Sequence, residues 1–193
     1  MSASSTFAHE RWLKMPGLLP KPLRARVETI ARPLIERGLA GELNDGDEVA
    51  PEAIGWYGHP ELDRVLAFLA GPIGRAVGAE LLPTYSFLRF YPAGAALSRH
   101  RDREACEVSA TLPIAPVDAA AWPIHLGAES GPGVAVAARA GEAVIYAGPE
   151  LWHWREALAA PWSLHLFLHY VRADGEHAHL KFDRRTALGT PPA

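Results

Sequence analysis

Three side chains in this sequence have the types and the order needed to bind one divalent transition metal. His100 and Asp102 stand two residues apart, and on an extended strand residues at that spacing point to the same side. His153 follows about fifty residues later, after an apolar run. Two histidines and one carboxylate on one face of a metal leave its other positions open for reactants, which suits iron(II). The alternative is a chance surface triplet at 100–102 together with a packed core histidine at 153.

A longer pattern around these residues resembles a known family. Tyr91 and Gly94 form a Tyr-x-x-Gly run that leads into the His-x-Asp pair, and Gly-Glu-Ala-Val-Ile-Tyr at 141–146 comes before His153. Together with the spacing of the candidate ligands, this pattern resembles the 2-oxoglutarate- and iron(II)-dependent oxygenases of the prolyl-hydroxylase-like type over residues 82–172. Four further motifs resemble uncharacterised bacterial members: Pro-Thr-Tyr-Ser at 83–86, Cys-Glu at 106–107, Trp-Pro at 122–123 and His-Trp-Arg-Glu at 153–156.

The resemblance implies an enzyme that oxidises a small molecule, an amino acid or a peptide side chain, with succinate and carbon dioxide as co-products. It implies that His100, Asp102 and His153 hold the iron, and that 2-oxoglutarate and dioxygen take the remaining positions. The metal and the cosubstrate supply the difficult chemistry, while the protein supplies geometry and excludes water. Halogenating relatives lack the carboxylate ligand, so Asp102 favours hydroxylation.

The cation that such enzymes use to pair with the C5 carboxylate of 2-oxoglutarate is missing from its usual place. Relatives carry an arginine or a lysine about ten residues after the distal histidine, where this sequence has Trp162 and Ser163. A buried carboxylate without a partner is costly, so another cation must serve. We expect Arg155, which shares a strand face with His153, and as second choice Arg89, which shares a face with Tyr91. Three neighbours are expected to help hold the cosubstrate: Tyr91, Ser163 and His165.

Other readings of these residues remain open at this point. Arg155 could instead form a surface ion pair with Glu150 or Glu156. The missing cation also supports a cupin-like metalloenzyme that uses the three ligands without 2-oxoglutarate. A non-catalytic barrel that binds a ligand or partner is a third reading, which the intact set of ligands disfavours.

The elements expected to position these residues form two layers. Residues 1–80 read as helical, with apolar residues at helical spacing over 23–34 and again from Pro60 onward. From residue 84, short runs rich in aromatic and β-branched residues recur between prolines and glycines. Eight strands are expected: 84–91, 96–102, 107–114, 121–126, 133–138, 142–147, 151–156 and 162–171. This pattern predicts a mainly β fold, a double-stranded β-helix of the jelly-roll or cupin-like type, packed against the N-terminal helices.

Several local features carry expectations of their own. Pro33 should kink or end the first helix, and a short third helix should hold Ile73 and Val77. Residues 40–58 read as a surface loop, and residues 173–193 as a C-terminal tail whose histidines at 177 and 179 are solvated. Arg99, Arg101 and Arg103 read as a solvated strand edge, although Arg103 could reach the mouth of the pocket.

Length and composition limit the remaining possibilities. The 193 residues suit one domain over 1–193, and 49% hydrophobic with 21% charged residues is typical of a soluble globular protein. A net charge of −3 disfavours binding to nucleic acid or to a membrane surface. The single cysteine, Cys106, cannot form an internal disulfide and is expected to be a small buried side chain without a chemical role. Without a signal peptide or a membrane span, the protein is expected in the cytoplasm. Substrate and oligomeric state stay open.

Overall fold

Two antiparallel sheets and three helices make up the computed structural model, which describes residues 2–42 and 47–190. The helices are α1 (Ala3–Glu10), α2 (Lys21–Leu39) and α3 (Pro60–Val77), with short 3-10 segments at Glu104–Cys106 and Ala178–Arg184. The strands are β1 (Trp12–Met15), β2 (Ile54–Tyr57), β3 (Leu81–Pro92), β4 (Leu97–His100), β5 (Val108–Ala115), β6 (Ile124–Gly127), β7 (Val134–Val136), β8 (Ala143–Tyr146), β9 (Trp152–Arg155) and β10 (Trp162–Arg172).

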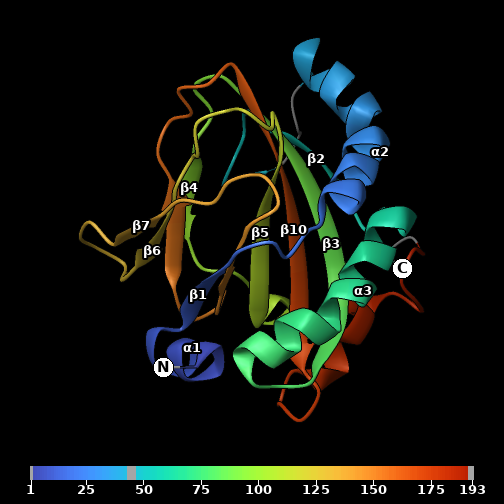
Figure 1. Cartoon of the computed structure of the whole chain (residues 1–193), viewed down its shortest axis with the longest axis vertical. Helices are drawn as coiled ribbons and strands as arrows, with labels where there is room; N and C mark the ends of the chain where they lie inside the picture. The colour runs from blue at the N-terminus through green and yellow to red at the C-terminus, as the bar shows by residue number, and fades with distance from the viewer. Residues whose placement is uncertain (1, 43–46, 191–193) are drawn as a thin grey trace.

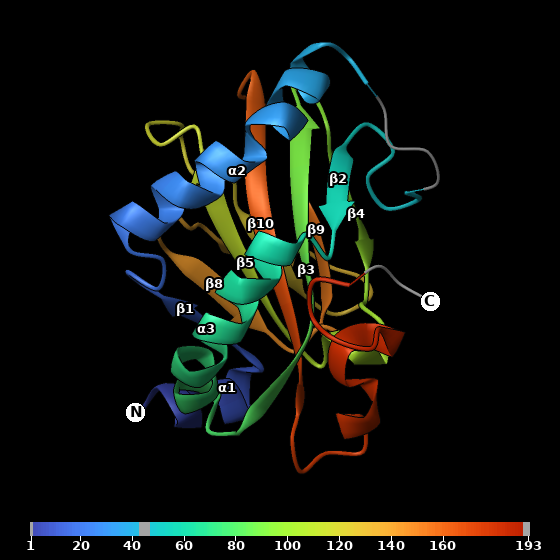
Figure 2. The ribbon, with the colours of Figure 1, turned by 90° about the vertical axis from the view of Figure 1, so that its right-hand side faces the viewer.

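The strands from β3 to β10 form the predicted double-stranded β-helix. The larger sheet has the order β1-β8-β5-β10-β3-β2 and the smaller sheet the order β4-β9-β6-β7, and the two face one another (Figure 1). Each of the eight expected strands overlaps one of β3–β10. Figure 2 shows α2 and α3 crossing the outer face of the larger sheet. The prediction of a mainly β fold covered by N-terminal helices is therefore confirmed.

The central strand β10 contributes residues both to the apolar core and to the space between the two sheets. Its leucines at 164, 166 and 168 are fully buried in the same apolar cluster as Val27 of α2 and Leu66 of α3. Because side chains alternate along a strand, the residues between these leucines point to the space between the two sheets. That inner face of β10 carries Ser163, His165, Phe167 and His169. Alternate residues of β10 therefore either pack in the apolar core or face the polar space between the two sheets.

The N-terminal layer differs from the sequence prediction in two ways. It contains two strands, because β1 pairs with β8 and β2 pairs with β3 at the edges of the larger sheet. The strand β2 falls in the predicted loop 40–58, of which 43–46 lie outside the described residues. The helices are also longer than expected: α2 continues through Pro33, and α3 runs unbroken through Pro72. Apolar residues on both sides of each proline are buried, which holds each helix together as one unit.

The C-terminal segment is packed against the rest of the fold. Arg185 is buried and donates to the Asp63 carboxylate of α3 at 2.6 Å and to the Thr84 carbonyl oxygen at 2.7 Å. Asp183 accepts two hydrogen bonds from Arg103, at 2.5 and 2.6 Å. Within the predicted C-terminal tail 173–193, Asp183 and Arg185 therefore have charged partners far away in the sequence. None of the helices in the described ranges is long and apolar enough to cross a lipid bilayer.

This buried ion pair predicts a large effect on stability. Arg185→Ala should lower the free energy of unfolding by roughly 3–5 kcal/mol, because it leaves the Asp63 carboxylate buried without its cation. Urea denaturation followed by tryptophan fluorescence measures the change. Arg26→Ala is the matched control, since Arg26 contacts Glu61 at 2.8 Å on the surface and should cost less than about 1 kcal/mol. Equal losses in the two variants would show that the C-terminal segment does not anchor the fold.

Candidate active site

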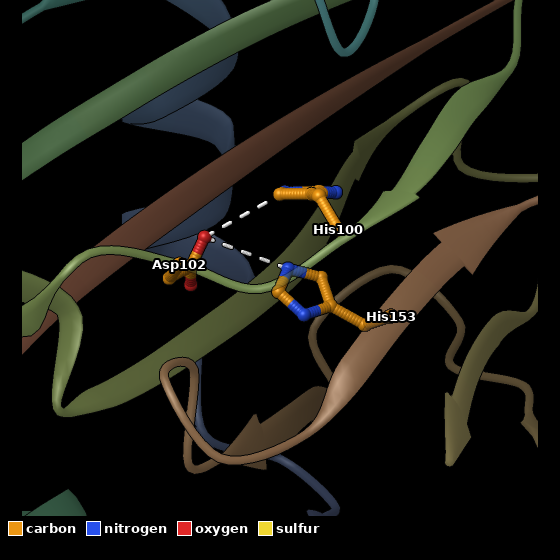
Figure 3. Close-up of side chains that lie close together, drawn as sticks. All are labelled: His100, Asp102 and His153. Atoms are coloured by element: carbon orange, nitrogen blue, oxygen red, sulfur yellow. Dashed lines mark ion pairs between the residues drawn. The ribbon is translucent and has the colours of Figure 1, made fainter. Parts of the chain in front are cut away.

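The three predicted metal ligands converge between the ends of two paired strands. His100 ends β4 and lies directly opposite His153 of β9 in the antiparallel register, and Asp102 follows β4. The Asp102 Oδ1 atom lies 3.7 Å from Nε2 of His100 and 3.5 Å from Nε2 of His153 (Figure 3). The candidate ligand atoms of all three residues lie within 4.8 Å of one another. Strand pairing therefore brings together side chains that are far apart in the sequence.

Backbone carbonyls orient both imidazoles toward the carboxylate. Nδ1 of His100 lies 2.7 Å from the Ser98 carbonyl oxygen, and Nδ1 of His153 lies 3.0 Å from that of Leu151. A carbonyl oxygen can only accept, so each Nδ1 carries the proton and each Nε2 keeps its lone pair. This is the tautomer in which histidine binds a metal through Nε2, and the carbonyl acts as the outer partner that holds the ring.

Asp102 is fixed by its surroundings in the ionised state. Burial raises its pKa, but the side chains of His100 and His153 beside it outweigh this and hold the pKa well below its usual range. The second carboxylate oxygen, Oδ2, accepts from Ser109 Oγ at 2.9 Å. A Cβ at Gly148 would collide with Oδ2 and lie 2.6 Å from the Cys106 carbonyl oxygen, so this position has room only for glycine. Oδ1 is thus left to face the two histidines.

The donor set fits an octahedral metal that keeps open positions. Two neutral imidazole nitrogens and one carboxylate oxygen on one side are the ligands that non-haem iron(II) enzymes use. The three residues line a cavity of about 380 Å³, a size typical of small-molecule sites. The other lining residues are Asp47, Val49, Tyr57, Tyr85, Phe87, Arg89, Leu97, Arg101, Arg103, Cys106, Tyr146, Phe167 and His169.

Arg155 lies two residues along β9 from His153, buried between the two sheets. Its guanidinium donates to the Trp122 carbonyl oxygen and, at 3.2 Å, to Thr111 Oγ1, while its Nε atom has no partner among the described residues. No carboxylate of the described chain forms an ion pair with it, and burial lowers its pKa to about 10. The alternative of a surface ion pair with Glu150 or Glu156 is therefore excluded.

Arg89 differs from Arg155 because it already has a carboxylate partner. It forms a buried ion pair with Asp47, and its guanidinium stacks over the Phe87 ring at 4.8 Å. Arg89 lines the cavity that contains the three ligands, whereas Arg155 is not one of the lining residues. The two arginines therefore differ in position and in charge pairing. Arg89 lines the cavity, and Asp47 neutralises its charge. Arg155 does not line the cavity and has no carboxylate partner among the described residues.

The remaining predicted cosubstrate residues surround Arg155. His165 Nδ1 lies 3.4 Å from the Arg155 guanidinium, and His165 Nε2 lies 3.0 Å from Ser163 Oγ. Burial, and secondarily the nearby Arg155 charge, hold the pKa of His165 well below its usual range, so this ring is neutral. Tyr91 is fully buried and packs edge-on against His165 and Trp122. All four residues thus form one polar cluster between the sheets.

Sequence reasoning did not single out Tyr146 and Ser109, whereas it placed His169 on the polar face of the last strand, hydrogen-bonded within the barrel. Tyr146, in the apolar strand β8, packs against His153 with ring centroids 4.7 Å apart and lines the cavity. Ser109 and His169 form a hydrogen-bonded pair behind Asp102, with 2.9 Å between Oγ and Nδ1. Period-two alternation on β8, β5 and β10 places all three on inner faces and is the only sequence signal for them.

The other residues with sequence expectations are placed as follows. Cys106 is buried, as expected, and burial raises the pKa of its thiol. Arg103 does reach the cavity, as does Arg101, whereas Arg99 is half-buried and lies over the Trp154 ring. The histidines at 177 and 179 belong to no metal-binding cluster within the described ranges.

Comparisons with protein-family models and with curated proteins find no match for this sequence. Solved structures do match. A prolyl-4-hydroxylase from Pseudomonas putida has a TM-score of 0.66 at 20% identity, covering 88% of this chain and 97% of that one. A prolyl hydroxylase from Trichoplax adhaerens, in complex with a hypoxia inducible factor peptide fragment, has a TM-score of 0.68 at 12% identity, covering 88% and 87%. The epimerase SnoN in complex with Fe3+, alpha ketoglutarate and nogalamycin RO has a TM-score of 0.67 at 16% identity, covering 99% and 91%.

The chain has the fold of the 2-oxoglutarate/iron(II) oxygenases. The resemblance seen in the motifs at 82–172 extends in three dimensions over most of the chain, including the N-terminal helices. Within this oxygenase fold, the His100, Asp102 and His153 cluster is a possible metal site with the expected donor types. The matched structures include hydroxylases and an epimerase, so the fold by itself does not specify the outcome of the oxidation.

Proposed function

We propose that this protein is an iron(II)- and 2-oxoglutarate-dependent oxygenase that hydroxylates a small molecule, an amino acid or a peptide side chain. The observation that carries the proposal is the convergence of His100, Asp102 and His153, with both Nε2 lone pairs directed at one carboxylate oxygen. Iron, 2-oxoglutarate and dioxygen supply the oxidising chemistry when bound, with succinate and carbon dioxide as co-products. The protein supplies the ligand geometry and a cavity that limits access of water.

Arg155 is the residue that we propose for the C5 carboxylate of 2-oxoglutarate. It is a buried cation whose partners among the described residues are all neutral, and a bound carboxylate would give it a counter-charge. Tyr91, Ser163 and His165 would complete the hydrogen bonds around that group. Arg89 is the second choice, because Asp47 already neutralises it.

Anaerobic titration with iron(II) and 2-oxoglutarate tests the proposal. We expect a weak visible absorption band when both are present, because a chelated 2-oxoglutarate allows charge transfer from the metal. Iron(II) alone, and iron(II) with succinate, serve as controls that lack the chelating keto acid. Saturable iron binding without the band would contradict the role of 2-oxoglutarate.

A cupin-like metalloenzyme that does not use 2-oxoglutarate is the second candidate function. The observation that favours it is the absence of a cation at Trp162 and Ser163 on β10. This second function predicts that iron binds without the absorption band and that no succinate forms from 2-oxoglutarate. A chain that fails to bind iron altogether would instead be a non-catalytic binding module.

A further inference from the structure

A chain of hydrogen bonds links Asp102 to a histidine in the cavity wall. Ser109 Oγ lies 2.9 Å from Asp102 Oδ2 and 2.9 Å from Nδ1 of His169, and both Ser109 and His169 are buried. We propose that this chain makes His169 a substrate-positioning residue, whose free Nε2 accepts a hydrogen bond from a hydroxyl or amine of the substrate beside the metal. The inference rests on the proposed function, because it assigns the substrate class of that same site.

The position of each proton in this chain follows from the groups involved. A carboxylate that binds a metal through Oδ1 is ionised and can only accept, so the Ser109 hydroxyl donates its single proton to Oδ2 of Asp102. If that proton pointed elsewhere, two oxygens 2.9 Å apart would face each other without a hydrogen between them. The Cys106 carbonyl oxygen, at 3.3 Å from Ser109 Oγ, is more distant and uncharged. Ser109 Oγ must therefore accept from His169, so that Nδ1 carries the proton and Nε2 keeps its lone pair.

The lone pair on Nε2 is available to a ligand. His169 lines the same cavity as the three metal ligands, and among the described residues no group hydrogen-bonds to its Nε2 atom. Its ring packs against Tyr85, with centroids 4.5 Å apart, and lies parallel to the ring of Phe167 at 6.5 Å. The imidazole therefore has a defined orientation, and none of the described residues uses its acceptor nitrogen.

The surroundings of His169 indicate what kind of molecule it would hold. Tyr85 and Phe167 lie next to it, and together with Phe87 they line the cavity and offer apolar ring surface. An acceptor nitrogen surrounded by aromatic rings favours a ligand that is mostly apolar and carries one hydrogen-bond donor. The reason is that a polar group buried without a hydrogen-bond partner is costly. Since the other end of the chain is Asp102, this donor would be anchored next to the metal. The predicted substrate class is thus an apolar small molecule with a hydroxyl or amine group near the oxidised carbon.

Nitrogen-15 NMR of histidine-labelled protein tests the inference directly. The sample carries zinc, which does not react with dioxygen, together with 2-oxoglutarate, and the His169 resonances are identified by their loss in His169→Gln. We expect a ring protonated at Nδ1 and unprotonated at Nε2. Ser109→Ala should produce a mixture of tautomers, and Ser109→Thr, which keeps the hydroxyl, should restore the single one. A His169 protonated at Nε2 would overturn the proposal.

A pair of matched probes tests the acceptor role. Benzyl alcohol carries a hydroxyl donor on an apolar ring and toluene lacks it, so only the alcohol should move the His169 Nε2 resonance in the direction of a hydrogen-bonded nitrogen. Equal shifts with both probes, or none with the alcohol, would overturn the inference. The same spectra report His100 and His153: if zinc leaves these two unchanged, the proposed function fails, whereas zinc binding with the wrong His169 tautomer overturns only the present inference.

Discussion

Replacing His153 with alanine is expected to weaken iron(II) binding by more than about a hundredfold and to abolish 2-oxoglutarate-dependent succinate formation. The loss of an outer partner of a metal ligand typically costs 10–100-fold in affinity, and the loss of a ligand itself costs more. His153 is the most buried of the three ligands, with its side chain 1% exposed, so no other described group can move in easily to replace it. Anaerobic equilibrium dialysis gives the affinity, and succinate is measured by chromatography.

The control for this variant is a histidine that is exposed. His179→Ala removes an exposed imidazole whose Nδ1 lies 2.9 Å from the Glu176 carbonyl oxygen, and it should leave iron affinity and succinate formation unchanged. Because His153→Ala also opens a cavity, near-ultraviolet circular dichroism is recorded to verify that the variant is folded. A folded variant with iron affinity within tenfold of the wild type would remove His153 from the metal site.

The convergence of His100, Asp102 and His153 was predictable from the sequence because it depends on local rules and on one strand pairing. The two-residue spacing of His100 and Asp102 puts both on one side, and the apolar run before His153 marks β8 and the turn into β9. Once β4 and β9 lie side by side in the smaller sheet, the register brings the histidines opposite each other. Period-two alternation and the order of the strands are therefore nearly sufficient to predict that these three side chains meet.

Other parts of the molecule were not predictable because they depend on partners far away in the sequence. The edge strands β1 and β2 are four residues long and are defined only by their pairing with β8 and β3. The same holds for Arg185, whose anchor Asp63 lies on α3, and for the contact of Ser109 with His169 across β5 and β10. A single sequence indicates which residues share a face of an element, but it does not indicate which element that face meets.

The proposal of Arg155 as the cosubstrate cation rests on a difference between two residues of the same type. Both Arg155 and Arg89 were candidates by strand face, and both are buried. Arg89 has Asp47 as its counter-charge, whereas the described residues provide Arg155 only with a carbonyl, a hydroxyl and an imidazole. A buried cation without an anion is unfavourable, which is why burial lowers the pKa of Arg155 to about 10. An anionic ligand would relieve this cost.

Arg155→Ala is therefore expected to raise the half-saturating concentration of 2-oxoglutarate by at least about thirtyfold. Truncating one partner of a buried, hydrogen-bonded charge pair costs roughly 2–5 kcal/mol, and ~2 kcal/mol corresponds to about thirtyfold in affinity. The concentration dependence of the anaerobic absorption band measures this, and iron(II) affinity without 2-oxoglutarate should change little because Arg155 is not one of the three ligands. Arg155→Lys, which keeps the charge but not the fork of donors, should fall between the wild type and alanine.

Arg89→Ala is the matched comparison, since it removes the same side chain type from a neighbouring buried position. Because Asp47 already neutralises Arg89, its loss should raise the half-saturating concentration of 2-oxoglutarate much less than the loss of Arg155. The reverse order of the two effects would transfer the cosubstrate role to Arg89, which lines the cavity of the metal ligands. If neither variant changes the concentration dependence while iron still binds, then no buried arginine pairs with the cosubstrate. In that event the metalloenzyme that works without 2-oxoglutarate becomes the better account of the site.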